Sequence, residues 1–113
     1  MSKQFVRPLR LFLLTIFLFL SSYSFSDTIW IDVRSIVEHR LDSIEGDPRI
    51  SHSDIASEVA VRYPDKATDI RLYCRSGGRA AKAAAALEAV GYRQVSNVGG
   101  IDDAREARGL SVK

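Results

Sequence analysis

One short run of residues has the composition of an anion-stabilising loop around a nucleophile. Residues 74–79 read Cys-Arg-Ser-Gly-Gly-Arg, and Cys74 is the only cysteine of the chain. Gly77 and Gly78 allow a tight turn whose successive backbone N–H groups point inward and bind negative charge. The two arginines of the run add full positive charges, and the start of a following helix adds a partial one. All of these effects favour a thiolate over a thiol at Cys74.

The shift in pKa that this loop must produce is modest. A free cysteine with a pKa of about 8.5 is only about 3% thiolate at pH 7. A fall of about two pKa units, equivalent to roughly 2.7 kcal/mol, makes the thiolate the majority form. The alternative is a buried, inert cysteine at the end of a strand, which is a common position for a single cysteine. The glycine pair, the two arginines and the helix start favour the reactive cysteine.

The residues on either side of this run predict the two elements that position it. Residues 69–73 read Asp-Ile-Arg-Leu-Tyr and predict a strand that leads into the loop. Residues 80–90 have the highest helix propensity in the chain, and Gly91 ends the helix that they predict. In a parallel α/β sheet ligands bind at the carboxyl ends of the strands, and Cys74 stands at such an end.

Similar patterns predict the remaining elements. Ser35 and Glu38 form a capping box that opens a helix ending near residue 41. The other predicted segments are a strand at 28–33, a loop at 42–51 with a very short strand at 49–51, a helix at 53–63, a strand at 94–98 and a short polar helix after 101. We expect Gly99 and Gly100 to end the last strand, and the charges of the tail to form a solvated face. Strands that alternate with helices predict an α/β fold: one small domain with a mostly parallel sheet flanked by helices.

Residues 1–26 have the pattern of a cleavable signal peptide that precedes this domain. The segment contains three basic residues, no acidic residue, and an apolar run at 11–20 followed by small residues. Ten residues at about 1.5 Å each reach about 15 Å, whereas the hydrocarbon core of a bilayer is about 30 Å thick, so the run is too short to span it, and we expect no stable membrane anchor after cleavage. We therefore expect cleavage between Ser26 and Asp27, a mature domain at 27–113, and a periplasmic or otherwise exported protein.

The distribution of charge argues against a nucleic-acid partner. The whole chain has 16 Lys plus Arg against 14 Asp plus Glu, and removal of residues 1–26 leaves 13 cations against 14 anions. The mature domain therefore lacks the basic surface that nucleic acid requires. A single cysteine excludes a disulfide framework, and His39 and His52 lack the spacing of metal ligands. We expect both histidines on the surface or in loops, no metal, no cofactor and a monomeric protein.

Five motifs together resemble the rhodanese domain family, and within it the small periplasmic single-domain rhodaneses of the phage-shock protein E type. They follow the order and spacing of that family and cover most of residues 28–101: Ile-Asp-Val-Arg at 31–34, Ser-Ile-Glu-Gly at 43–46, Tyr-Cys-Arg-Ser-Gly-Gly-Arg at 73–79, Gly-Tyr at 91–92 and Asn-Val-Gly-Gly at 97–100. The resemblance implies a rhodanese-like α/β domain with thiosulfate sulfurtransferase activity.

The resemblance also implies a role for each residue of the loop. Cys74 would attack the outer sulfur of thiosulfate, release sulfite and hold the sulfur as a persulfide, which a thiophilic acceptor such as cyanide or a thiol then removes. Backbone N–H groups would stabilise the persulfide, and the residues that supply them are Arg75, Ser76, Gly77, Gly78 and Arg79. Arg75 would hold the sulfonate end of the donor. Asp32 and Arg34 would form an ion-paired framework near the loop.

Two other functions use the same residues. Cysteine phosphatases place five residues between the cysteine and the arginine of their loop, whereas four separate Cys74 from Arg79. A tetrahedral phosphate fits the shorter loop poorly, which disfavours a small phosphatase or arsenate reductase. The other alternative is a noncatalytic rhodanese-like binding module, and the presence of both the cysteine and the glycine-rich loop argues against it.

Overall fold

Three parallel strands form the sheet, with β2 in the middle. The computed structural model describes residues 27–112, so the predicted signal peptide at 1–26 lies outside the described residues. The strands are β1 (Ile29–Asp32), β2 (Asp69–Cys74) and β3 (Gln94–Gly100), in the order β1-β2-β3. Arg49 adds an isolated parallel bridge to Asp32, which corresponds to the very short strand predicted at 49–51.

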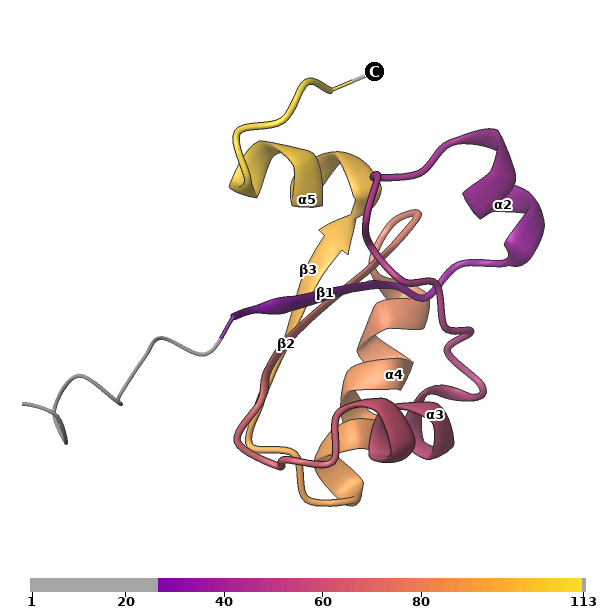
Figure 1. Cartoon of the computed structure of the whole chain (residues 1–113). Helices are drawn as coiled ribbons and strands as arrows, with labels where there is room; N and C mark the ends of the chain where they lie inside the picture. Colours follow the sequence, from indigo (N-terminus) through magenta and orange to yellow (C-terminus); the bar gives the residue numbers. More distant parts are fainter. Residues whose placement is uncertain (1–26, 113) are drawn as a thin grey trace, which may run out of the picture.

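Helices cover both faces of this sheet, as the alternating pattern predicts (Figure 1). They are α2 (Ile36–Leu41), α3 (Ile55–Arg62), α4 (Gly78–Ala89) and α5 (Ile101–Ala107). α4 packs on β2 and β3, and α3 packs against α4. α5 packs on the same two strands from the opposite face. The predicted α/β fold is therefore confirmed. No helix among residues 27–112 is long and apolar enough to cross a membrane.

Alternation along the strands divides the interior into two clusters. On β2, Leu72 and Cys74 face α3 and α4, whereas Tyr73 faces α5. This follows from the two-residue period of a strand, which sends successive side chains to opposite faces. The larger cluster also contains Ala80 and Ala83 of α4, whose small side chains are fully buried against the sheet. Cys74 consequently sits on the helix-covered face, next to the start of α4.

The capping box predicted at the start of α2 is present. The Ser35 Oγ accepts a hydrogen bond from the Glu38 backbone N–H at 3.2 Å, and the Glu38 carboxylate accepts one from the Ser35 N–H. α2 is unusual in having no buried residue, and its apolar Leu41 is 81% exposed. Because so little apolar surface is buried there, polar contacts must hold α2 in place.

The prediction that Gly99 and Gly100 end the third strand is wrong. β3 continues through both residues, with a register irregularity opposite Leu72 and Tyr73. Gly99 has a φ of +99°, a conformation that glycine adopts without the steric cost that other residues incur. The glycines therefore kink the strand without breaking its pairing to β2, and they bring its end against the loop that follows Cys74.

The expectation that the charges of the tail form a solvated face is also wrong for Arg105. This side chain on α5 is only 4% exposed, and it forms ion pairs with Asp42 at 2.6 Å and Asp102 at 2.9 Å. Two carboxylates offset the cost of removing the guanidinium from water. α5 is thereby anchored to the segment that follows α2.

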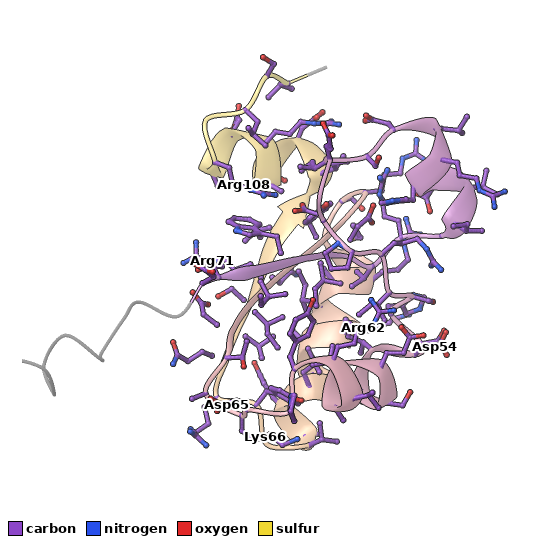
Figure 2. All side chains as sticks on the ribbon, viewed as in Figure 1. Asp54, Arg62, Asp65, Lys66, Arg71 and Arg108 are labelled. Atoms are coloured by element: carbon purple, nitrogen blue, oxygen red, sulfur yellow. The ribbon has the colours of Figure 1, made fainter. Side chains whose placement is uncertain are left out.

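A second arginine network joins the far end of α5 to the sheet. Figure 2 shows Arg71 and Arg108 on the side of the molecule where β1 begins, and their guanidinium carbons lie 5.4 and 4.7 Å from the centre of the Trp30 ring. Arg108 also forms an ion pair with Asp47 at 2.6 Å. Cations placed over the face of an indole ring are attracted by its quadrupole. Trp30 therefore packs within the fold, between these two side chains.

Candidate active site

Cys74 is the last residue of β2 and lies at the carboxyl edge of the sheet, where the parallel topology predicts a ligand site. Its side chain is 1% exposed. The chain then turns through residues 75–77 and enters α4 at Gly78. Of the two loop glycines only Gly77 has a left-handed φ, +102°, so it is Gly77 that makes the tight turn possible.

The turn directs backbone N–H groups at the sulfur. The Gly77 N–H donates a hydrogen bond to the Cys74 Sγ at 2.9 Å. Burial raises the pKa of the Cys74 thiol, but the surrounding N–H groups favour the anion by more, so the net pKa lies below its ordinary value. The groups responsible belong to Ala80, Ser76, Gly77 and Arg79. Backbone dipoles at the start of α4 thus have the effect on Cys74 that the glycines and helix start predict.

Cys74 should therefore ionise at a lower pH in the folded protein than in the unfolded chain. Above the folded pKa the thiolate predominates; the thiolate and its reactivity are lost as the pH falls through that value. The corresponding contribution to the free energy of unfolding is fully present above an unfolded pKa of about 8.5 and is lost as the pH falls through the folded pKa. Ultraviolet absorbance of the thiolate against pH measures both midpoints, with the chain in urea as reference because Cys74 is its only cysteine. Equal midpoints would contradict the anion-stabilising loop.

The end of β3 supports the loop from below. The Asn97 side-chain amide donates to the Gly77 carbonyl oxygen at 2.9 Å. At Gly100 an added Cβ would lie 2.4 Å from the Arg75 carbonyl oxygen, so this position admits only glycine unless the loop moves. These contacts with the end of β3 therefore fix the position of the loop relative to the sheet. In the sequence this contact appears only as an asparagine at 97 and a glycine pair at 99–100, a pattern that predicts the end of a strand.

The two arginines of the loop differ in what their side chains do. Arg79 forms a two-point ion pair with Glu38 of α2, with N–O distances of 2.6 and 2.8 Å. The hydrogen bond from Arg79 holds the pKa of Glu38 well below its usual range. Within residues 27–112 Arg75 is exposed and has no ion-pair partner. The full charge left for a ligand is thus that of Arg75, whereas Arg79 attaches α2 to the loop.

Asp32, Arg34 and His39 form a cluster next to the loop. The Asp32 side chain is fully buried, and its carboxylate accepts hydrogen bonds from the Arg34 guanidinium at 2.9 and 3.0 Å. The same carboxylate lies 3.0 Å from the His39 Nδ1. The expected ion pair of Asp32 and Arg34 is therefore present. His39 keeps 25% of its side chain exposed, as a surface position requires, but its ring on α2 also contacts a buried carboxylate that the sequence analysis did not assign to it.

An open cleft of about 260 Å³ runs beside the loop. Its lining residues come from α2 and its flanks and from the loop itself: Arg34, Glu38, Leu41, Asp42 and Arg75. Cys74 is not among them, but Arg75 follows it directly and Glu38 holds the other end of the loop. Glu38 and Asp42 are functional candidates that the sequence analysis did not single out for this site. Glu38 had a local signal, the capping box, which predicts a helix start and says nothing of a cleft.

Residues 27–112 contain no cluster of three or more His, Cys, Asp and Glu side chains that could hold a metal ion. The site consists instead of one buried sulfur, a cradle of N–H groups and one unpaired guanidinium. Such a site can hold an anion, generate a thiolate and stabilise negative charge on a sulfur attached to it.

The sequence and the fold of this chain are similar to those of known proteins. The rhodanese-like domain family matches residues 21–107. The thiosulfate sulfurtransferase PspE of Escherichia coli strain K12 is 31% identical over 91 residues, which cover 80% of this chain and 88% of that protein. A solved rhodanese with anions from E. coli is 30% identical, with a TM-score of 0.65 and coverage of 68% of this chain and 91% of that one. The human single-domain sulfurtransferase TSTD1 shares the fold, at 21% identity, with a TM-score of 0.57 and coverage of 70% and 81%.

Proposed function

The chain belongs to the rhodanese-like domain family, and from this membership we propose that it is a sulfurtransferase working through a persulfide on Cys74. The proposed donor is thiosulfate, and the proposed acceptor is a thiophilic small molecule such as a thiol or, in an assay, cyanide. The observation that carries the proposal is the Cys74 sulfur at the centre of the loop, where it accepts the Gly77 N–H at 2.9 Å and has a lowered pKa.

This arrangement supports the proposed first half of the reaction. The Cys74 thiolate attacks the outer sulfur of thiosulfate and forms a new S–S bond. The bond between the two sulfurs of the donor breaks, and its electron pair leaves with sulfite. The sulfur that remains carries negative charge as a persulfide, and the N–H groups of residues 75–79 stabilise it as an oxyanion hole stabilises an oxygen. The identity of 31% to a protein named as a thiosulfate sulfurtransferase supports thiosulfate as the donor.

The remaining site residues have supporting roles in this proposal. Arg75, which has no ion-pair partner within residues 27–112, holds the sulfonate end of thiosulfate while the outer sulfur is attacked. The ion pair of Arg79 with Glu38 holds α2 in position beside the loop. The contacts of Asp32 with Arg34 and His39 do the same. Apart from the backbone N–H groups that Arg75 and Arg79 contribute to the loop, these residues act by positioning the donor and the site.

We place this activity outside the cytoplasm, in a domain comprising residues 27–113 after removal of residues 1–26. The proposal rests on the basic start, the short apolar run and the small residues before Asp27. We further propose that the mature domain acts as a monomer and keeps no stable membrane anchor.

Incubation of the folded protein with thiosulfate tests the proposed function directly. We expect the intact mass to rise by about 32 Da, one sulfur atom, with release of one equivalent of sulfite. Subsequent addition of cyanide should return the mass to its starting value. A folded protein that stays unmodified contradicts the proposal. Turnover of an aryl phosphate or arsenate in its place would favour the phosphatase or reductase alternative.

A further inference from the structure

The cleft beside the loop is larger than the proposed donor needs. Its volume of about 260 Å³ corresponds to about nine water molecules at roughly 30 Å³ each. Thiosulfate has five heavy atoms, and the N–H groups around Cys74 already form a cradle for its negative charge. The cleft therefore has room for a second, larger molecule within reach of the loop.

The charges that line the cleft have partners, with one exception. Glu38 is paired with Arg79, and Asp42 is paired with the buried Arg105. Arg34 is paired with Asp32. These pairs neutralise both carboxylates, so the cleft offers no uncompensated negative charge to a cationic ligand.

Arg75 is the exception among the lining residues. It has no ion-pair partner within residues 27–112, and it is exposed at the edge of the cleft directly after the nucleophile. A guanidinium binds a carboxylate through two parallel hydrogen bonds, an arrangement that adds both strength and orientation. The cleft therefore presents one site for an anionic group, on the residue that follows the nucleophile in the chain.

Leu41 is the second lining residue that can contact a ligand in the cleft, through its apolar side chain. Its side chain is 81% exposed at the end of α2 and lines the same cleft. An exposed leucine in a cleft with one unpaired cation matches a ligand that has a short carbon chain and a carboxylate. Removal of such a chain and of Leu41 from water contributes favourably to binding.

From these observations we infer that the cleft is the acceptor subsite, and that the preferred sulfur acceptor is a small thiol carrying a carboxylate. The carboxylate lies on Arg75 and the carbon chain lies over Leu41. The inference rests on the proposed function and specifies the acceptor of that same site. Sulfite leaves before the acceptor binds, so one guanidinium serves the donor first and the acceptor afterwards.

The second half of the reaction then balances without another reactant. The acceptor thiol gives its proton to the outer sulfur of the anionic Cys74 persulfide, and the acceptor thiolate formed in this way makes an S–S bond to that sulfur. The bond between that sulfur and the Cys74 Sγ breaks, and its electron pair remains on Sγ. The products are a small-molecule hydropersulfide and the Cys74 thiolate that begins the next cycle.

The test compares two acceptors of similar size that differ in charge, 3-mercaptopropionate and 2-mercaptoethanol. The protein is first loaded fully with excess thiosulfate, loading is verified by mass, and the loss of sulfur to each thiol is followed in a single turnover. We expect Arg75→Gln to lower the ratio of the rate constants, anionic over neutral, by about tenfold. Arg93→Gln is the matched control, because it removes an exposed arginine at the opposite end of the sheet and should leave the ratio unchanged. Comparison of this ratio between the wild type and each variant cancels the difference in intrinsic nucleophilicity between the two thiols.

A binding measurement on the unloaded protein keeps this inference separate from the proposed function. Titration with 3-(methylthio)propionate, which cannot accept sulfur, should shift the amide resonances of Arg75 and Leu41, whereas 2-(methylthio)ethanol should not. Arg75→Gln should abolish these shifts. If the wild type loads with sulfur but the rate ratio is the same in Arg75→Gln, the inference fails and the proposed function stands. If the protein does not load, the proposed function fails, and the titration alone decides whether the cleft binds carboxylates.

Discussion

Replacement of Cys74 with serine should abolish sulfur transfer, with a fall in kcat/KM of at least about a thousandfold. A serine hydroxyl remains protonated in this loop at neutral pH and cannot hold sulfane sulfur as a persulfide. The smaller side chain still offers an acceptor to the Gly77 N–H, so the loop should keep its conformation. The assay is sulfite release from thiosulfate with cyanide as acceptor, together with the intact mass after incubation.

Two controls make the result of Cys74→Ser interpretable. Thermal unfolding of the variant should resemble that of the wild type, which shows that activity is lost without loss of the fold. The wild type should gain about 32 Da from thiosulfate and the variant should gain nothing. Turnover that persists in the folded variant would show that another group carries the sulfur. Normal biological performance of a strain carrying the variant would instead favour the noncatalytic binding module.

Replacement of Asp32 with alanine should lower the free energy of unfolding by about 3–5 kcal/mol. The Asp32 side chain is fully buried and pairs with Arg34, whose side chain is 6% exposed, so the variant leaves a guanidinium in the interior without its charge partner. It also removes the acceptor of His39 on α2. For a domain with a total stability of about 5–15 kcal/mol, this is a large part of the whole.

Urea denaturation of Asp32→Ala, followed by circular dichroism, measures this loss. Asp54→Ala is the matched control, since Asp54 is exposed before α3 and its side chain makes no cap hydrogen bond, so the change should stay within about 0.5 kcal/mol. Figure 2 shows Asp54 at the outer edge of α3, where the substitution meets solvent. A loss below about 1 kcal/mol in Asp32→Ala would mean that water reaches the Arg34 guanidinium and that the cluster is not closed.

Local patterns were sufficient for most of the architecture. The capping box at Ser35, the alanine-rich segment of α4 and the alternating residues of β2 each determine an element through contacts within a few residues. The Cys74 loop belongs to the same class, because a strand end, a left-handed glycine and a helix start are all neighbours in the chain. Its lowered pKa follows from backbone groups that these elements must bring together.

Long-range contacts decided where the local rules failed. Gly99 and Gly100 have the composition of a strand end, yet pairing with β2 and contact with the Arg75 carbonyl oxygen keep them in β3. Arg105 has the polarity of a surface residue, yet its partner Asp42 is 63 residues away in the chain. His39 likewise acquires a function in the fold only because β1 places Asp32 beside it.

Residues adjacent in the chain account for the fold class, for the position of Cys74 at a strand end and for the N–H cradle around it. Tertiary structure alone decided how the charges are used. It pairs Arg79 with Glu38 across 41 residues, pairs Asp42 with Arg105, and leaves Arg75 without an ion-pair partner in residues 27–112, beside the cleft. The physical reason is that a guanidinium reaches several ångströms from its backbone, so the carboxylate that it meets depends on which elements pack together and not on its neighbours in sequence.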